Sequence, residues 1–263
     1  MDNRGPDNLP PKNAPFTASG DPAPARTVTP GGSLPPACHL PSEKPAVKSN
    51  IKREQAIPKD SLFFIRRDNI SHIISENYSY KTETYYSILS YELEGRPVLP
   101  SSRVILDAYV VPLCLERAKR GGIPVCDWGI SQGYVPLPVI LYGLNYFATT
   151  SDFFVVDDNT RAKEVIRHIT NIGKYPFCYQ KLEEGATIHS CIGIFGKTIN
   201  DCSGISDMAK KVYELFSIPL VMMVFVKNND KYRLSSLAPV KYSQLSGEER
   251  TLLSAYLTNQ EYL

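Results

Sequence analysis

The sequence predicts an α+β fold, a single mixed-sheet domain with flanking helices, preceded by a disordered N-terminal tail. Segments with strand periodicity and segments with helix periodicity interleave over residues 61–263 without a strict β–α–β alternation, which favours α+β over parallel α/β. Residues 1–60 hold 12 of the 21 prolines and a single aromatic residue, Phe16, so this tail has too little apolar surface to offset its ordering entropy. Residues 61–263 hold all 16 tyrosines, enough for one substantial core.

The folded part begins with two predicted strands and a helix. Residues 62–67 and 69–75 are rich in Ile and Phe and are separated by turn residues, a pattern typical of two short strands. Thr82 is a suitable N-cap for a helix with an acidic first turn, and apolar residues follow at helical spacing until Gly95. Residues 98–99 lie between two prolines and are expected to be extended.

A second helix is predicted over residues 104–120. It ends in two basic residues and two glycines, the cationic last turn and glycine stop that favour a helix C-terminus. Pro112 lies inside this range and removes one backbone donor, so the helix should kink or break near Val110. Residues 121–138 contain repeated Pro and Gly, which argues against a long central strand there.

The second half of the chain contains further strands and helices. Strands are expected at short apolar or alternating runs, and helices where apolar residues recur on one face between cap and stop residues. The predicted elements are, in order, strands at 139–142 and 153–156, a helix at 160–172, strands at 175–182 and 187–195, a helix at 205–216, strands at 219–227 and 232–240, and a final helix that follows a capping box of Ser246 and Glu249 and ends near Leu257.

Charge and hydropathy exclude two classes of partner. The formal net charge is +2, and residues 1–60 account for all of it, so residues 61–263 are neutral. A nucleic-acid-binding surface usually needs a basic excess, so no nucleic-acid partner is predicted. The longest apolar run, residues 134–147, contains two prolines and is shorter than the roughly 20 residues that a membrane span needs, so no membrane association is predicted. The N-terminus lacks the apolar segment of a signal peptide, which favours a cytoplasmic location.

The six cysteines contain no C-x-x-C pair and are expected to be mostly small buried side chains. One alternative is a metal site, or a cysteine-dependent enzyme, built from Cys178, His189, Cys191 and Cys202, because four soft ligands lie within 25 residues. No phosphate-binding loop, dinucleotide-binding loop, zinc-protease helix or nucleophile elbow is present. The sequence therefore predicts no catalytic residue and no cofactor.

A tyrosine-rich segment, residues 77–86, lies at a predicted strand-to-helix junction. Free backbone N–H groups at a helix start, together with phenol hydroxyls, are suited to a carboxylate or phosphate. The segment predicts a ligand or partner site made of Asn77, Tyr80, Lys81, Tyr85 and Tyr86. The alternative is that Tyr85 faces the core and the other rings line an interface, as aromatic stripes usually do.

Two segments resemble a known family. The sequence NYSYKTETYYSILSYELEGRPVLPS resembles the RimK-like ATP-grasp N-terminal domain (RLAN), in which a Tyr-rich turn leads into a helix and an extended VLPS. The sequence GIFGKTINDCSGISDMAKKVYELFSIPLVMMVFVKNNDKYRLSSLAPVKYSQLSGEERTLLSAYL resembles the closing part of the same domain. Together the two similarities cover about residues 62–102 and 192–257, and residues 103–191 are interpreted as an enlarged middle segment of a domain that spans residues 61–263.

The resemblance implies a role close to ATP-dependent amide-bond formation, in peptide biosynthesis or modification. Too few residues follow Leu257 to form a catalytic ATP-grasp module, and although residues 173–186 resemble an ATP-grasp strand and loop, no metal carboxylates accompany them. We therefore expect a non-catalytic accessory or recognition domain without nucleotide turnover. Its expected partner is a separately encoded ATP-grasp ligase or a peptide-like ligand, and a homo-oligomer is the alternative.

Overall fold

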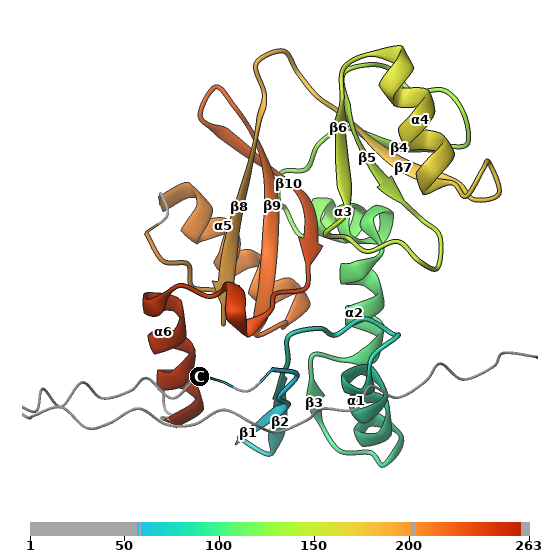
Figure 1. Cartoon of the computed structure of the whole chain (residues 1–263). Coiled ribbons are helices and arrows are strands. Elements are labelled where there is room, and N and C mark those ends of the chain that lie inside the picture. Colours follow the sequence, from blue (N-terminus) through green and yellow to red (C-terminus); the bar gives the residue numbers. More distant parts are fainter. Residues whose placement is uncertain (1–56, 58, 201–202, 259–263) are drawn as a thin grey trace, which may run out of the picture. The chain divides into compact units, whose positions relative to one another are not determined.

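A computed structural model of the chain describes residues 57, 59–200 and 203–258 (Figure 1). These residues all belong to one compact unit. Helices and strands occur in several mixed layers, which confirms the predicted α+β class. The predicted disordered tail, residues 1–60, lies almost entirely outside the described residues.

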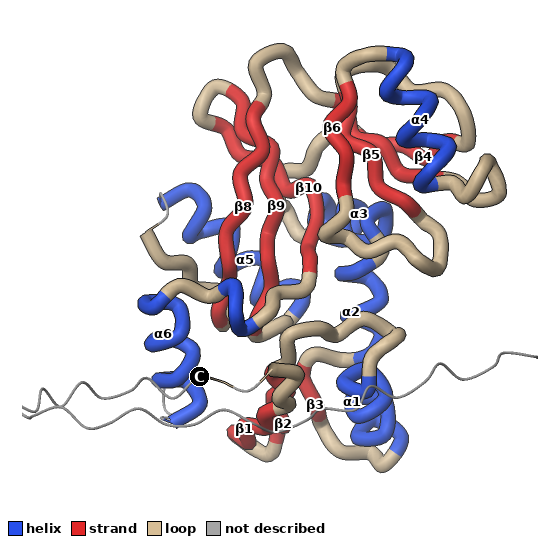
Figure 2. The backbone as a smooth tube through the Cα atoms, viewed as in Figure 1, coloured by secondary structure: helices blue, strands red, loops and turns tan. Residues whose placement is uncertain are grey.

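The strands form three separate sheets (Figure 2). The first sheet has the order β1-β2-β3, with β1 and β2 antiparallel and β3 parallel to β2; the second is the antiparallel sheet β10-β9-β8; the third is the antiparallel sheet β4-β7-β5-β6. The strand bounds are β1 (Phe63–Arg67), β2 (Ile70–Ile74), β3 (Val98–Leu99), β4 (Trp128–Ser131), β5 (Val139–Gly143), β6 (Phe153–Val156), β7 (Phe177–Lys181), β8 (Thr187–Ile194), β9 (Leu220–Asn228) and β10 (Lys231–Ala238).

Six α-helices and one 3-10 turn connect these strands within the described residues. Their bounds are α1 (Glu83–Leu93), α2 (Ser102–Tyr109), α3 (Val111–Arg120), α4 (Asn159–Ile169), α5 (Ser203–Phe216), the 3-10 turn η1 (Tyr242–Gln244) and α6 (Gly247–Thr258). The predicted break near Val110 is confirmed, because this residue is extended and separates α2 from α3, while Pro112 lies in the first turn of α3. Proline is tolerated there since the first-turn N–H groups have no partner inside the helix.

The third sheet is buried on both faces around β5. Val139 and Leu141 pack with residues of α4 on one face, and Ile140 and Tyr142 pack with residues of α3 and β9 on the other. A continuous apolar strand is the expected sequence pattern for such a position. The second sheet packs with α2, α3 and α5 in the largest core cluster, which also includes residues of β2 and α1. The cores of the first and second sheets are thus continuous.

Strand β4 is an element that the sequence did not predict. It is a four-residue strand at the edge of its sheet, where the surrounding prolines remove no central ladder hydrogen bond. Gly129 lies opposite Tyr179 on β7, and a Cβ atom at this glycine would meet the tyrosine ring at 2.6 Å. The glycine therefore makes room for the aromatic ring of the neighbouring strand.

Among the described residues, no helix is both long and apolar enough to cross a membrane.

Several buried tyrosines predict a loss of stability in alkali. Burial raises the pKa of Tyr213 from 10.0 to about 12, and burial likewise raises the pKa values of Tyr78, Tyr142 and Tyr242. Because the unfolded chain loses these protons first, stability is fully present below about pH 10 and decreases as pH rises through the folded-state values. We expect the urea midpoint to fall steadily above about pH 10.

The control for this prediction is Tyr213→Phe, which removes one of these groups and retains the ring. Its urea midpoint should fall less between about pH 10 and 12 than that of the wild type. An identical fall in both proteins would contradict the assignment to Tyr213.

Candidate functional site

A cavity of about 300 Å³ lies beside the junction between β2 and α1, and we name it the Lys81 pocket. Residues of the junction, the end of α2, the loop before β6 and the residue after β10 line it: Asn77, Ser79, Tyr80, Lys81, Thr82, Ile105, Leu106, Tyr109, Val110, Ala148, Thr149, Thr150 and Pro239. Its volume is at the lower end of the range typical of small-molecule sites. Four separate parts of the chain therefore meet around one small cavity.

Local hydrogen bonds hold the junction in place. The Tyr78 hydroxyl, which is fully buried, accepts from the Ser75 N–H and donates to the Ile73 carbonyl. Asn77 Oδ1 accepts from the Ser79 N–H at 2.9 Å, and Thr82 Oγ1 donates to the Ser79 carbonyl at 2.7 Å. Asn and Thr side chains commonly form such turns with their own backbone. The backbone that presents Tyr80 and Lys81 is thus fixed before any ligand binds.

Lys81 is the charged residue of this pocket, and no other charged residue that the structure describes lines it. Its Nζ donates to the Tyr146 carbonyl and, at 3.5 Å, to the Ala148 carbonyl. The same atom lies 4.6 Å from the centre of the Tyr146 ring and 5.6 Å from that of Tyr80. An ammonium group has three N–H donors, so one donor remains for a ligand.

Two hydroxyl groups of the lining have no hydrogen-bond partner. Tyr109 Oη and Thr150 Oγ1 are both buried and both unpaired. A buried polar group without a partner costs about 1–3 kcal/mol. Burial also raises the pKa of Tyr109, so its hydroxyl stays protonated and can donate. One ammonium and two unpaired hydroxyls, with no carboxylate beside them, make this pocket suitable for an anion.

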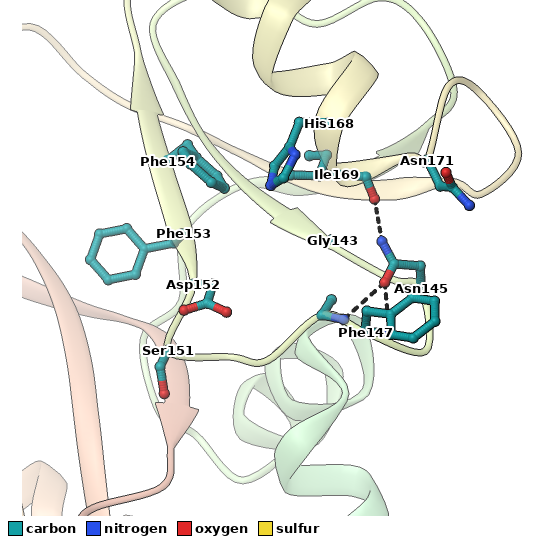
Figure 3. Close-up of a pocket in the computed structure, with 11 residues that line it drawn as sticks. Gly143, Asn145, Phe147, Ser151, Asp152, Phe153, Phe154, His168, Ile169 and Asn171 are labelled. Atoms are coloured by element: carbon teal, nitrogen blue, oxygen red, sulfur yellow. Dashed lines mark hydrogen bonds between the residues drawn. The ribbon is translucent and has the colours of Figure 1, made fainter. Parts of the chain in front are cut away.

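A second cavity of about 580 Å³ lies between the end of α4 and the start of β6, and we name it the Asp152 pocket (Figure 3). Its lining is Gly143, Asn145, Phe147, Ala148, Ser151, Asp152, Phe153, Phe154, His168, Ile169 and Asn171. Asn145 joins the loop after β5 to the end of α4. Its Oδ1 accepts from the Phe147 N–H at 2.7 Å and the Ala148 N–H at 2.8 Å, and its Nδ2 donates to the Ile169 carbonyl at 2.5 Å.

The loop between β5 and β6 separates the two cavities. Ala148 lines both of them, Thr150 lines the Lys81 pocket, and Ser151 and Asp152 line the other. Lys81 holds the loop from one side, and Asn145 holds it to the C-terminal end of α4. A ligand in either cavity therefore contacts the same short loop.

The structure brings together three of the five residues that the sequence predicted for this site. Asn77, Tyr80 and Lys81 line the Lys81 pocket. Tyr85 is partly buried against the main core, and Tyr86 is 61% exposed and touches the Tyr85 ring, so neither lines the pocket. Tyr109 and Thr150 were not predicted as site residues. The residues around each of them in the sequence do not indicate that it packs beside the junction between β2 and α1.

The structure does not bring together the described residues of the alternative metal site. Cys178 lies on β7 in one core cluster, and Cys191 lies on β8 in another. The His189 ring contacts Tyr232, and Cys202 lies outside the described residues. Over the part of the chain that is described, no three His, Cys, Asp or Glu side chains form a group that could hold a metal ion.

The buried thiols predict resistance to alkylation. Burial raises the pKa values of Cys114, Cys126 and Cys178 to about 12. Since the thiolate is the nucleophile, only about one thiol in ten thousand is reactive at pH 8. We expect peptide mass spectrometry to find these three cysteines unmodified after iodoacetamide treatment of the native protein and fully modified in urea. Rapid native labelling of any of the three would contradict the burial.

Part of the chain matches a known protein family. Residues 159–256 match the RimK-like ATPgrasp N-terminal domain. The match runs from α4 to α6 and includes most of the second segment that resembles this family. It also includes residues 159–191 of the middle segment, for which no resemblance to this domain was predicted, and it leaves out residues 62–102. No curated protein matched the sequence.

Solved structures resemble a larger part of the chain. A RimK domain ATP-grasp protein from Sphaerobacter thermophilus DSM 20745 has a TM-score of 0.52 and 14% identity, over 68% of this chain and 78% of that one. The D-alanine–D-alanine ligase from Coxiella burnetii has a TM-score of 0.50 and 12% identity, over 69% of this chain and 63% of that one. At these identities the similarity is one of fold.

The expectation of a non-catalytic accessory domain is wrong. The similarity to an ATP-grasp protein and to a ligase covers 68% and 69% of the chain. The middle segment, residues 103–191, contains α3, the whole third sheet and α4, so it is a folded layer in its own right. That expectation rested on the few residues after Leu257 and on the absence of metal carboxylates, whereas this fold is preserved at 12% and 14% identity.

Proposed function

We propose that this chain is a ligase of the ATP-grasp type, which joins a carboxylate-bearing, amino-acid-like or peptide-like substrate to an amine. In this proposal the Lys81 pocket binds the substrate carboxylate. The RLAN match and the ATP-grasp and ligase folds support the reaction class. The observation that supports the substrate class is the combination of Lys81 with the unpaired hydroxyls of Tyr109 and Thr150.

The chemistry of the pocket favours a carboxylate over a neutral group. An ammonium donor and an ionised acceptor form a charge-assisted hydrogen bond, which contributes about 1.5–3 kcal/mol. A carboxylate in this pocket compensates the charge of Lys81, whereas an amide or alcohol in the same place leaves that charge uncompensated. The apolar side chains of Ile105 and Leu106 in the same lining provide contact for the substrate's carbon atoms.

The fold implies a magnesium nucleotide, and the described residues do not fit one. Magnesium is usually held by carboxylates together with phosphates. No carboxylate lines the Lys81 pocket, Asp152 is the one carboxylate of the second cavity, and the described residues contain no three-membered ligand group. The proposal therefore rests on the substrate pocket and the fold, and no step is assigned to nucleotide or metal.

The test is product formation by the full chain. The protein is incubated with ATP, magnesium chloride and a mixture of amino acids and short peptides, and mass spectrometry measures condensed products and ADP. We expect a product whose mass equals the sum of the masses of its two parts less one water, with one ADP and one phosphate released per amide bond. Absence of any ATP-dependent product over the whole mixture would overturn the ligase proposal.

Lys81→Met is the variant that ties this activity to the pocket. It keeps most of the apolar stem and removes the ammonium, so we expect turnover to fall at least tenfold, about 1.4 kcal/mol or more. Lys163→Met is the matched control, because Lys163 is an exposed lysine of α4 that lines neither cavity. Equal activity of Lys81→Met and Lys163→Met would remove the Lys81 pocket from the proposal.

A further inference from the structure

The Asp152 pocket differs in chemistry from the Lys81 pocket. Its lining contains one carboxylate and no lysine or arginine. Asp152 forms no ion pair and its carboxylate makes no hydrogen bond to any residue that the structure describes. Lys81 and Arg167 line the neighbouring cavities and not this one. The charge of Asp152 is thus not neutralised by a cation of the described chain.

The end of α4 forms one wall of this pocket. His168 and Ile169 are the last two residues of the helix, and both line the cavity. The last turn contains the basic residues Arg167 and His168, and its carbonyl groups already accept hydrogen bonds, His168 from the Asn171 N–H and Arg167 from the Ile172 N–H. The carbonyl of Ile169 accepts from Asn145 Nδ2, and this bond keeps the helix end and the loop at a fixed separation.

Aromatic rings form the other walls of the pocket. Phe154 lies beside His168, with the two ring centres 6.1 Å apart, whereas the Phe153 ring points away from the centre of the pocket (Figure 3). Phe147 is 77% exposed although it lines the cavity. A phenylalanine ring that is this exposed contributes little to the packing of the core, and exposed apolar side chains often mark a binding site. The face of an aromatic ring also attracts a cation.

We propose that the Asp152 pocket binds an organic cation, an ammonium or guanidinium group on an apolar stem. The Asp152 carboxylate receives the charge, and Phe147 and Phe154 contact the stem. The volume of about 580 Å³ suits an amine with one aromatic or aliphatic side chain. The proposal concerns a different cavity from the Lys81 pocket, so it stands whether or not the chain forms amide bonds.

The test compares matched probes by NMR on the ¹⁵N-labelled full chain. Phenethylamine is the free-amine probe, acetyl-arginine amide is the probe for a cation within a peptide, and 2-phenylethanol is the neutral counterpart. We expect the cations to shift the backbone amide signals of Gly143 and Ala148, with at least tenfold higher affinity than the alcohol. If only phenethylamine binds, the natural cation is a free amine. If only acetyl-arginine amide binds, the natural cation is a side chain within a peptide.

Asp152→Asn is the decisive variant, since it is isosteric and changes only the charge. It should lose at least tenfold in affinity for the cation while its binding of the alcohol stays the same. Asp157→Asn is the control, because Asp157 is exposed at the other end of β6 and lines neither pocket. Equal affinity of the wild type for amine and alcohol, or an unchanged affinity in Asp152→Asn, would overturn the proposal.

Discussion

Replacing Glu76 by alanine should lower the free energy of unfolding by about 3 kcal/mol, because it leaves buried N–H groups without an acceptor. Glu76 is 6% exposed, and its carboxylate accepts from the Tyr242 N–H on one oxygen and, at 3.2 Å, from the Asp60 N–H on the other. Its own carbonyl accepts from the Val240 N–H at 3.1 Å. The residue therefore joins the junction of the Lys81 pocket to the segment that follows β10.

Urea unfolding followed by circular dichroism measures this effect. Glu76→Gln should be destabilised by less than Glu76→Ala, since the amide oxygen still accepts one of the two hydrogen bonds. Glu164→Ala is the control, an exposed glutamate of α4 whose replacement should change stability by no more than about 0.5 kcal/mol. A Glu76→Ala protein as stable as this control would show that the buried carboxylate does not hold the junction.

Replacing Tyr142 by phenylalanine should cost about 2 kcal/mol, although the ring itself is retained. Tyr142 lies on β5 of the third sheet, and its hydroxyl is 2.8 Å from Ser235 Oγ and donates to Ser236 Oγ at 3.1 Å. Both serines are fully buried on β10 of the second sheet. The substitution leaves two serine hydroxyls without this partner, while Gln180 Nε2 continues to donate to the Ser235 carbonyl.

A double-mutant cycle separates the hydrogen bonds from the packing of the ring. In a background in which Ser235 and Ser236 are both alanine, Tyr142→Phe should cost less than about 1 kcal/mol, because no buried hydroxyl is then left unpaired. The same cost in both backgrounds would show that the hydroxyl bridge between the sheets contributes nothing. Urea unfolding of the four proteins gives the interaction free energy directly.

The local parts of the fold could be predicted from the sequence. The break at Val110 follows from Pro112, and the capping box forms as expected, with Ser246 N–H donating to Glu249 Oε2 at 2.7 Å and Glu249 N–H donating to Ser246 Oγ at 3.3 Å. These features depend on residues a few positions apart. Strand β4 could not be predicted, because its place depends on Tyr179, which lies fifty residues further along the chain.

The same distinction holds for the candidate site. Asn77, Tyr80 and Lys81 are close in sequence at a strand-to-helix junction, so their pattern was visible. Tyr109 and Thr150 reach the pocket from α2 and from the loop before β6, and only the packing of the sheets brings them there. The function was predicted wrongly because the few residues after Leu257 and the missing metal carboxylates were taken to exclude catalysis, whereas the fold resembles those of an ATP-grasp protein and a ligase.

The most direct test of the account is whether the Lys81 pocket distinguishes a carboxylate from its neutral counterpart. Saturation-transfer NMR with a set of short peptides that end in a free carboxylate, and with the same peptides amidated, measures this in the wild type and in Lys81→Met. We expect the wild type to bind the free carboxylates and not the amides, and Lys81→Met to lose this preference. Equal binding of both sets by the wild type, or a preference retained in Lys81→Met, would contradict it.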